Sequence, residues 1–530
     1  MTKADVIPSP ETTAATPGAD APEPTPDVAR TAGRGGLAVA FAKLYFILQG
    51  LVQQIALPRV LGLDGYGAWS TVNSIASVTY NPVVSMSIQG VSRAVAEAQP
   101  AEQAAALRRT LGVHAVFALV LATGFFFLSP LILSSAGAPH LTVGLQLLSG
   151  AMLIYALYAP LIGALNGQKR FLFQAGFDVL AATLRTTGLV VGAWLFVRRG
   201  HDGVEGAASG FVLALVLLLV LAVSVVGIGR RGSGGVSVRQ HIAFLVPVLT
   251  GQALLNLLLQ ADLTLLRRFA ADAALAKGLA LTAADPLVGA YRATQLFSFL
   301  PYQLLISVNF ILFPMLASAV RDRDREAIAR FVATGVRIAL VIAGLMVSVT
   351  AGLSDQLLEL VFGKQAAELG GRSLELLALG FGAFAIFGVL TTVLNSLKQE
   401  RASALVTLVA ATSVAALCFL RVRGSEFGEG LLFRTASATS VGLLIATVGA
   451  AILVRRAAGA VVAPLSVVRV VSAVALTVTV GRWLPDHGKF FTVVYAGVLV
   501  LGYSLTLILL RELDRRDLAM VYNVVARRKR

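Results

Sequence analysis

The sequence predicts an all-α integral membrane protein of about fourteen transmembrane helices. Of its 530 residues, 57% are hydrophobic and only 14% are charged, and the mean hydropathy is +0.80, whereas soluble domains are about 25% charged. The apolar residues come in runs of about 20, the length that a helix needs to cross a hydrocarbon core of about 30 Å. The runs lack the alternation of barrel strands, and lipid offers the backbone no hydrogen-bond partners, so each run is expected to be a helix.

The predicted spans are separated by loops too short to hold a folded domain outside the membrane. They begin near Gly36, Tyr66, Leu111, Leu141, Phe173, Val204, Ile242, Pro286, Phe331, Leu374, Ala402, Gly430, Leu465 and Phe491.

The distribution of basic residues predicts the orientation of these spans. Fourteen spans put both termini on one side, and 26 of the 44 Lys and Arg residues lie in the termini and loops of that side, against 12 in the opposite loops. Basic residues accumulate in cytoplasmic loops, so both termini are expected in the cytoplasm. The loop that carries Arg267, Arg268 and Lys277 runs against this rule. The same bias explains most of the net charge of +16 and argues against a nucleic-acid partner.

An internal repeat predicts two lobes. Leu165-Asn166 at the end of span four aligns with Leu394-Asn395 at the end of span ten, and Lys169 aligns with Lys398 at the same offset. Six spans separate the two copies, so both halves run in the same direction across the membrane, as a parallel repeat that is typical of transporters. We expect an N-terminal lobe over 36–230, a C-terminal lobe over 231–457 and two appended spans over 458–511.

The chain ends and the cysteine content predict little chemistry. Residues 1–35 are expected to be a disordered cytoplasmic tail, because they are rich in proline and lack the apolar core of a signal peptide. Residues 512–530 are expected to be a basic cytoplasmic tail. The single cysteine, Cys418, cannot form an intramolecular disulfide, and the five histidines show no spacing typical of zinc ligands. The sequence predicts no cofactor and no metal.

Eight ionisable residues fall within the predicted spans, where a charge costs several kcal/mol and usually faces a cavity or a partner. They are Lys43, Asp178, Arg185, Asp262, Arg292, Arg337, Arg434 and Arg469. Six are basic, which favours an anionic ligand, because guanidinium groups pair with phosphate oxygens through two bonds. Lys43 and Arg292 are the strongest candidates for substrate binding, one in each lobe, and Arg185 and Arg434 are further candidates.

Several of these charges also have an ordinary structural interpretation. Asp178 and Arg185 lie seven residues apart on one helix face and can serve each other. Arg337 and Arg434 lie near span ends, where their guanidinium groups can reach water. Asp262 is predicted to be a counter-ion of Arg292 or a cation-coupling site, and Asp178 has the same two interpretations.

Enzyme signatures are absent from the sequence. It contains no phosphate-binding GxxxxGK[ST], no HExxH and no Ser/His/Asp arrangement, and the loops are too short for a catalytic domain. The chain is therefore predicted not to be an enzyme.

Five segments together resemble one family. They read LPRVLGLDGYGAWS at 57–70, ALNGQKRF at 164–171, QADLTLLRRF at 260–269, VGAYRATQLFSFLPYQLLISVNFILFP at 288–314 and LLELVFGKQ at 357–365. In this order, and with fourteen spans, they resemble the polysaccharide transporters of the multidrug/oligosaccharidyl-lipid/polysaccharide (MOP) exporter superfamily, the O-antigen-type flippases.

The resemblance implies a flippase that moves an undecaprenyl-pyrophosphate-linked oligosaccharide from the cytoplasmic to the periplasmic leaflet of a bacterial inner membrane. It also implies a cationic cavity between the lobes, with Lys43, Arg292 and Asp262 in spans that line it, and a polysaccharide polymerase and export machinery as partners. Three alternatives stay open: a flippase for the peptidoglycan precursor lipid II, a multidrug cation antiporter of the same superfamily, and a membrane scaffold for polysaccharide synthesis.

Overall fold

A computed structural model of the protein describes residues 26–230, 232, 237–485 and 487–513, and this part of the chain is helical without a strand. Its elements are α1 (Pro26–Glu97), α2 (Gln103–Ser135), the 3₁₀ turn η1 (Pro139–Leu141), α3 (Thr142–Gly167), α4 (Phe171–Arg198), α5 (Gly203–Val226), α6 (Val238–Ala276), the 3₁₀ turn η2 (Leu281–Ala283), α7 (Ala284–Ser298), α8 (Leu300–Arg321), α9 (Arg325–Gly352), α10 (Ser354–Phe362), α11 (Lys364–Ser396), α12 (Glu400–Val422), α13 (Glu429–Ala458), α14 (Pro464–Arg482) and α15 (Lys489–Leu509).

The described helices account for the predicted spans. Twelve are long and apolar enough to cross a membrane, or thirteen if the bent pair Leu281–Asn309 and Leu312–Arg321, which meets within α8, forms one span. This count takes α1 once, although Gly62, with a φ of 73°, breaks it into two helices. The Tyr66 hydroxyl donates to Gln54 Oε1 at 2.5 Å, whereas residues twelve apart in a continuous helix lie about 18 Å apart. The chain therefore reverses at Gly62, and the two halves of α1 are spans one and two.

The helices extend beyond the apolar runs that predicted them. The first begins at Pro26, so residues 26–35, predicted as disordered tail, are helical. Proline is favoured in the first turn of a helix, and a helix need not end where its residues become polar. The rest of the two predicted tails, 1–25 and 514–530, lies outside the described residues. The short helix α10, between α9 and α11, was not predicted.

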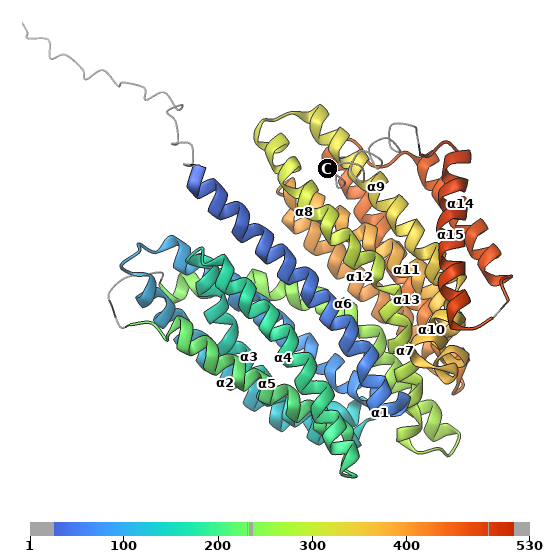
Figure 1. The fold of residues 1–530 in the computed structure, drawn as a ribbon, viewed down its shortest axis with the longest axis horizontal. Helices are drawn as coiled ribbons and strands as arrows, with labels where there is room; N and C mark the ends of the chain where they lie inside the picture. Colours follow the sequence, from blue (N-terminus) through green and yellow to red (C-terminus); the bar gives the residue numbers. More distant parts are fainter. Residues whose placement is uncertain (1–25, 231, 233–236, 486, 514–530) are drawn as a thin grey trace, which may run out of the picture.

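Two large hydrophobic cores divide most of the molecule. One is built from α1 to α5 and the other from α6 to α9 and α11 to α13, and we refer to these groups as the N-lobe and the C-lobe. In Figure 1 the N-lobe lies at the lower left and the later helices at the upper right. A third core joins α14 and α15 to α9 and α11, where the Tyr503 hydroxyl donates to the carbonyl oxygen of Val341 at 3.0 Å. The helix α6 also packs against α1 and α2, so it links the two lobes.

The turns that follow α3 and α11 have the same geometry. Lys169 and Lys398, which the repeat aligns, have φ angles of 58° and 59°. In each turn an amide closes on a carbonyl five residues back, Arg170 N to Leu165 O and Gln399 N to Leu394 O, both at 2.8 Å. Such left-handed helix ends usually use glycine, so two lysines at equivalent positions support the internal repeat.

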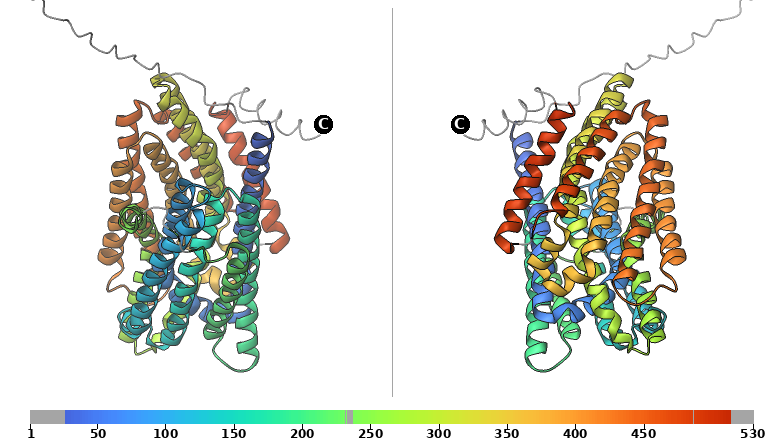
Figure 2. Two further views of the ribbon diagram at one scale, coloured as in Figure 1. Left: turned by 90° about the vertical axis from the view of Figure 1, so that its left-hand side faces the viewer. Right: turned by 90° about the vertical axis from the view of Figure 1, so that its right-hand side faces the viewer.

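The two ends of the helix bundle are distinct. The start of α1 and the end of α15 lie at the same end (Figure 2), which we call the terminal end, and the connections from α2 to α3 and from α6 to α7 lie at the opposite end.

Candidate functional site

Lys43 and Asp178 join the first half of α1 to α4. Lys43 Nζ lies 3.1 Å from Asp178 Oδ2, and the lysine side chain is 54% exposed while the aspartate is 15% exposed. The prediction that Asp178 pairs with Arg185 is therefore wrong. Two helical turns separate the two side chains by about 10 Å along α4, whereas Lys43 is on a neighbouring helix at the same level.

Arg185 has no carboxylate partner in the described part of the chain. Its guanidinium lies 4.6 Å from the centre of the Phe46 ring, and Nη1 is 3.5 Å from the Tyr155 hydroxyl, at the outer limit of a hydrogen bond. Its Nε is buried and without a hydrogen-bond partner. A buried donor left unpaired is costly, so Arg185 is a group that an anionic ligand would satisfy.

Arg292 lies in the C-lobe, on α7. It donates to Gln295 Oε1 at 3.0 Å, and it lies within electrostatic reach of the Tyr66 hydroxyl. As with Arg185, no carboxylate lies within ion-pair distance among the described residues.

Asp262 reaches Arg292 only through Gln295. The carboxylate is 1% exposed and accepts from Gln295 Nε2 at 3.0 Å, from the Tyr291 hydroxyl at 2.8 Å and from the Leu263 amide at 2.8 Å. It is thus held by neutral donors in the core of the C-lobe, and it makes no direct ion pair with Arg292.

One tyrosine is within electrostatic reach of both arginines. Arg185 and Arg292 both act on the Tyr80 hydroxyl, which donates to Asn73 Oδ1 at 3.1 Å. The Tyr80 ring stacks on Tyr155, with 5.7 Å between ring centres. The structure therefore places one guanidinium from each lobe within electrostatic reach of Tyr80, and among the described residues neither has a carboxylate partner. The tyrosines carried no signal in the sequence, because aromatic residues are also common in helical cores.

The other predicted charges lie elsewhere. Arg434 is exposed at the start of α13 and donates to Ser425 Oγ at 3.3 Å. Arg337 and Arg469 flank Glu512, at 2.9 Å and 3.4 Å. Glu512 is 1% exposed, so these two arginines fasten the end of α15 to α9 and α14.

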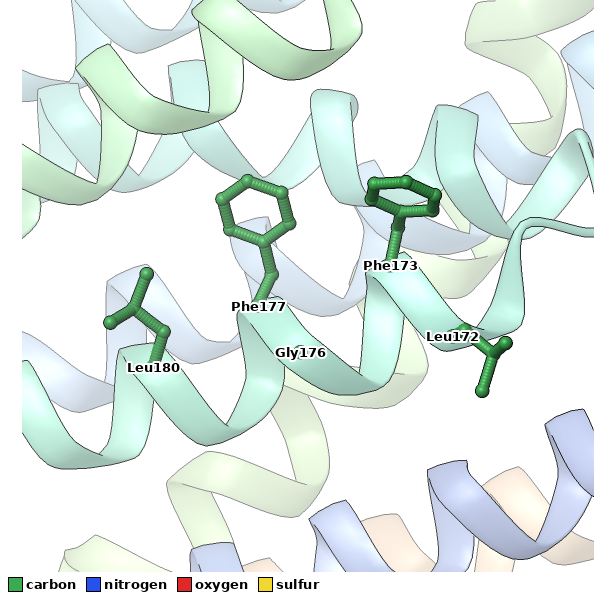
Figure 3. A pocket seen from close by; sticks show the side chains of 5 residues that line it. All are labelled: Leu172, Phe173, Gly176, Phe177 and Leu180. Atoms are coloured by element: carbon green, nitrogen blue, oxygen red, sulfur yellow. The ribbon is translucent and has the colours of Figure 1, made fainter.

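An apolar pocket lies along α4, the helix that carries Asp178 and Arg185. It has a volume of about 290 Å³ and is lined by Leu172, Phe173, Gly176, Phe177 and Leu180. Figure 3 shows the rings of Phe173 and Phe177 pointing to the same side of the helix.

A buried ionic contact closes the lobes against each other at the opposite end. Arg267 on α6 is fully buried, lies 3.4 Å from Asp285 and donates to the carbonyl oxygen of Gly137 in the N-lobe at 3.1 Å. His140 of the N-lobe reaches the same carboxylate, with 3.1 Å between Nε2 and Oδ2. We call these four residues the ionic contact. They explain why Arg267 breaks the charge rule: it is a buried structural residue, and that anomaly was the signal that could have found it.

Glycines bring the backbones together beside the ionic contact. A Cβ atom at Gly67 would overlap the carbonyl oxygen of Asp285 and lie 2.7 Å from the amide nitrogen of Gly289. The second half of α1 and α7 are therefore in close backbone contact at this end.

Known proteins share this fold but not this sequence. No family model matches the chain, and no curated protein matches it. Among solved structures it is similar to the lipid II flippase MurJ in an inward closed conformation, with a TM-score of 0.70 and 13% identity over 88% of this chain and 99% of that one.

Other structures of the same superfamily also match. A multidrug resistance MATE family transporter in an inward-facing conformation has a TM-score of 0.59 and 15% identity over 76% of this chain and 94% of that one. A MOP superfamily transporter from Pyrococcus furiosus, described as having a binding pocket of reversed polarity, has a TM-score of 0.57 and 13% identity over 81% of this chain and 96% of that one. The chain is a multi-pass membrane protein with the fold of the MOP superfamily transporters.

Proposed function

We propose that the protein is a flippase for an oligosaccharide linked to a polyprenyl pyrophosphate, and that it works by alternating access between its lobes. The observation that carries this proposal is the pair Arg185 and Arg292, one guanidinium from each lobe, both within electrostatic reach of Tyr80 and both without a carboxylate partner among the described residues. A pyrophosphate bound between them would engage both lobes at once.

The surroundings of the pair fit the two other parts of such a substrate. The stacked Tyr80 and Tyr155 offer flat apolar faces for sugar rings, and the pocket along α4 offers an apolar surface for part of a prenyl chain. A pyrophosphate and its sugars cannot cross hydrocarbon unaided, so a polar site inside the protein supplies what the bilayer lacks.

The direction of transport follows from the charge bias. With the terminal end in the cytoplasm of a bacterium, the membrane potential drives an anionic headgroup outward by about 2.3 kcal/mol per charge per 100 mV. The ionic contact then seals the periplasmic end while substrate enters from the cytoplasmic leaflet. A polysaccharide polymerase and export machinery would receive the product in the periplasm.

The test is a flipping assay in proteoliposomes that carry the undecaprenyl-pyrophosphate-linked oligosaccharide, read out by a membrane-impermeant glycosidase. We expect Arg185→Gln and Arg292→Gln each to slow flipping at least about tenfold, because hydrogen bonds to charged groups are worth about 1.5–3 kcal/mol. Lys43→Gln is expected to have a smaller effect, since its charge is already balanced by Asp178.

Arg434→Gln is the matched control, because it removes an exposed guanidinium far from Tyr80. If Arg434→Gln slows flipping as much as the other two variants, the assignment of the site is wrong. Unchanged flipping in an Arg185→Gln/Arg292→Gln double variant that inserts correctly would favour a scaffold role.

A lipid II flippase is the second candidate, favoured by the similarity to MurJ. The same assay with lipid II distinguishes the two, because only the true substrate should be flipped at a rate that depends on Arg185 and Arg292. The two unpaired cations argue against a multidrug cation antiporter, and uptake of a lipophilic cation in the same vesicles tests that class.

A further inference from the structure

Two buried histidines face each other between the lobes in the terminal half of the molecule. His114 on α2 and His241 on α6 are 0% and 3% exposed, and their Nε2 atoms lie 3.3 Å apart. The rings are nearly perpendicular, at 83°. We call these residues the histidine pair.

The geometry limits how many protons the pair can hold. In an N–H···N hydrogen bond one Nε2 carries the proton and the other offers its lone pair. His114 Nδ1 lies 3.1 Å from Ser87 Oγ, and this hydroxyl can donate to a bare nitrogen or accept from a protonated one. The contact between the two rings can therefore form when both rings are neutral or when the pair carries one added proton. Two added protons would place two N–H groups and two positive charges face to face, and the contact would break.

We propose that the histidine pair is a proton-binding site whose occupancy controls the separation of the lobes at the terminal end. This inference rests on the proposed function, because it names the ion that would be coupled to alternating access. When α2 and α6 separate, each ring gains water and can bind its own proton. The open state then holds more protons than the closed one, so a lower pH favours opening.

Protons can reach the pair through a polar crevice. The crevice has a volume of about 790 Å³, and its lining includes His241, Gln89, Arg93, Glu97, Gln240 and Glu400. Arg93 pairs with Glu97 at 2.7 Å and lies 4.6 Å from the centre of the Phe244 ring. The charged groups facing the crevice are thus one arginine and two glutamates, from α1 and α12. On α2, Arg108 and Arg109 precede His114, and on α6, Arg239 precedes His241.

The interface around the pair is tight enough to transmit a change in charge. A Cβ atom at Gly90 would overlap the Leu245 side chain and lie 3.2 Å from His241 Cε1. The same interface contains a bond that cannot titrate, from Asn81 Nδ2 to Asn256 Oδ1 at 3.0 Å. That bond lies farther along α6 at the same lobe interface, and it supplies a control without a titratable group.

The experiment measures the distance between α2 and α6 in the full chain reconstituted in lipid. The native cysteine is removed by Cys418→Ala, and spin labels are attached through Val116→Cys and Val238→Cys, both at exposed positions. As the pH falls from 8 to 5, we expect the long-distance population to rise with a midpoint below the ordinary histidine pKa of about 6.5, because proton binding must first offset the free energy that closes the lobes.

The variants separate titration from packing. We expect His114→Gln and His241→Gln to flatten the pH profile, and Asn81→Ala to raise the long-distance population while that population still depends on pH. A wild-type profile in the His114→Gln/His241→Gln double variant would overturn the proposal.

A control with a chelator tests whether the histidine pair binds a metal ion in place of a proton. No group of three or more potential metal-binding residues occurs in the described part of the chain, so EDTA is expected to leave the wild-type profile unchanged, and its loss with EDTA would overturn the proposal. The measurement uses no lipid-linked substrate. A distance that does not respond to pH would therefore contradict the proton-site proposal without contradicting the flippase proposal. A negative flipping assay would likewise not affect how the distance measurement is interpreted.

Discussion

The lobes meet through buried charges at the opposite end and through neutral side chains at the terminal end. Arg267, Asp285 and His140 form the first contact, and the histidine pair forms the second. An uncompensated buried charge costs several kcal/mol, whereas a neutral hydrogen bond exchanged for water costs about 0.5–1.5 kcal/mol. The difference indicates that the terminal end opens at a lower free-energy cost than the opposite end, unless the freed charges find new partners.

The largest expected effect comes from the glycine contact at the opposite end. Gly67→Val would place side-chain atoms where the Asp285 backbone lies, and neither backbone can give way. We expect this variant to hold the lobes apart at that end and to reduce flipping by at least an order of magnitude.

The readout is labelling of Ser135→Cys, in the Cys418→Ala background, by a membrane-impermeant thiol reagent. Ser135 is exposed beside the ionic contact, and labelling should be faster when the lobes are apart. Gly124→Val is the control, because no atom lies within 4 Å of a Cβ atom there. Equal labelling rates in the two variants would contradict a sealed opposite end.

The second effect concerns the ionic contact itself. Arg267→Met leaves the Asp285 carboxylate buried without its guanidinium, a change that typically costs about 3–5 kcal/mol. We expect a large fall in the thermal unfolding temperature in detergent, partly restored by adding Asp285→Asn.

Arg268→Met offers a matched comparison one residue away. Arg268 pairs with Asp272 at 3.1 Å, but the two side chains are 44% and 49% exposed, and exposed pairs contribute about 0–1 kcal/mol. If Arg268→Met destabilises the protein as much as Arg267→Met, burial is not what distinguishes the two arginines.

The smallest expected effect concerns Asp355 and the way in which the free energy of unfolding depends on pH. Burial raises the pKa of Asp355 on α10, and the carboxylates of Glu375, Glu429 and Glu359 raise it further. A raised pKa means that the native state binds a proton more tightly than the unfolded state, so this group destabilises the fold as the pH rises through its pKa.

Asp355→Asn should therefore raise stability at pH 7 by less than about 1 kcal/mol, because the side chain is only partly removed from water, which screens its charge. The gain should vanish below the ordinary pKa of aspartate, near pH 4. Thermal unfolding at both pH values checks this, and a gain of equal size at both would show that charge is not its source.

Features that depend on residues close together in the chain were predictable from the sequence. The spans followed from apolar length, and the repeat followed from two Leu-Asn pairs whose turns proved equivalent at Lys169 and Lys398. Two spans beginning near Gly36 and Tyr66 were predicted, and the structure places the break between them at Gly62. The prediction that Lys43 and Arg292 belong to different lobes also followed, because span order alone determines it.

The sequence by itself determined that the chain crosses the membrane many times as helices, since lipid leaves the backbone no other solution. Only the tertiary structure decided which buried charges have partners. Lys43 pairs with Asp178 and Arg337 with Glu512, while Arg185 and Arg292 have no carboxylate partner among the described residues. The physical reason is distance: an ion pair requires atoms within 4 Å, and residues far apart in the chain reach that separation only once the lobes have packed.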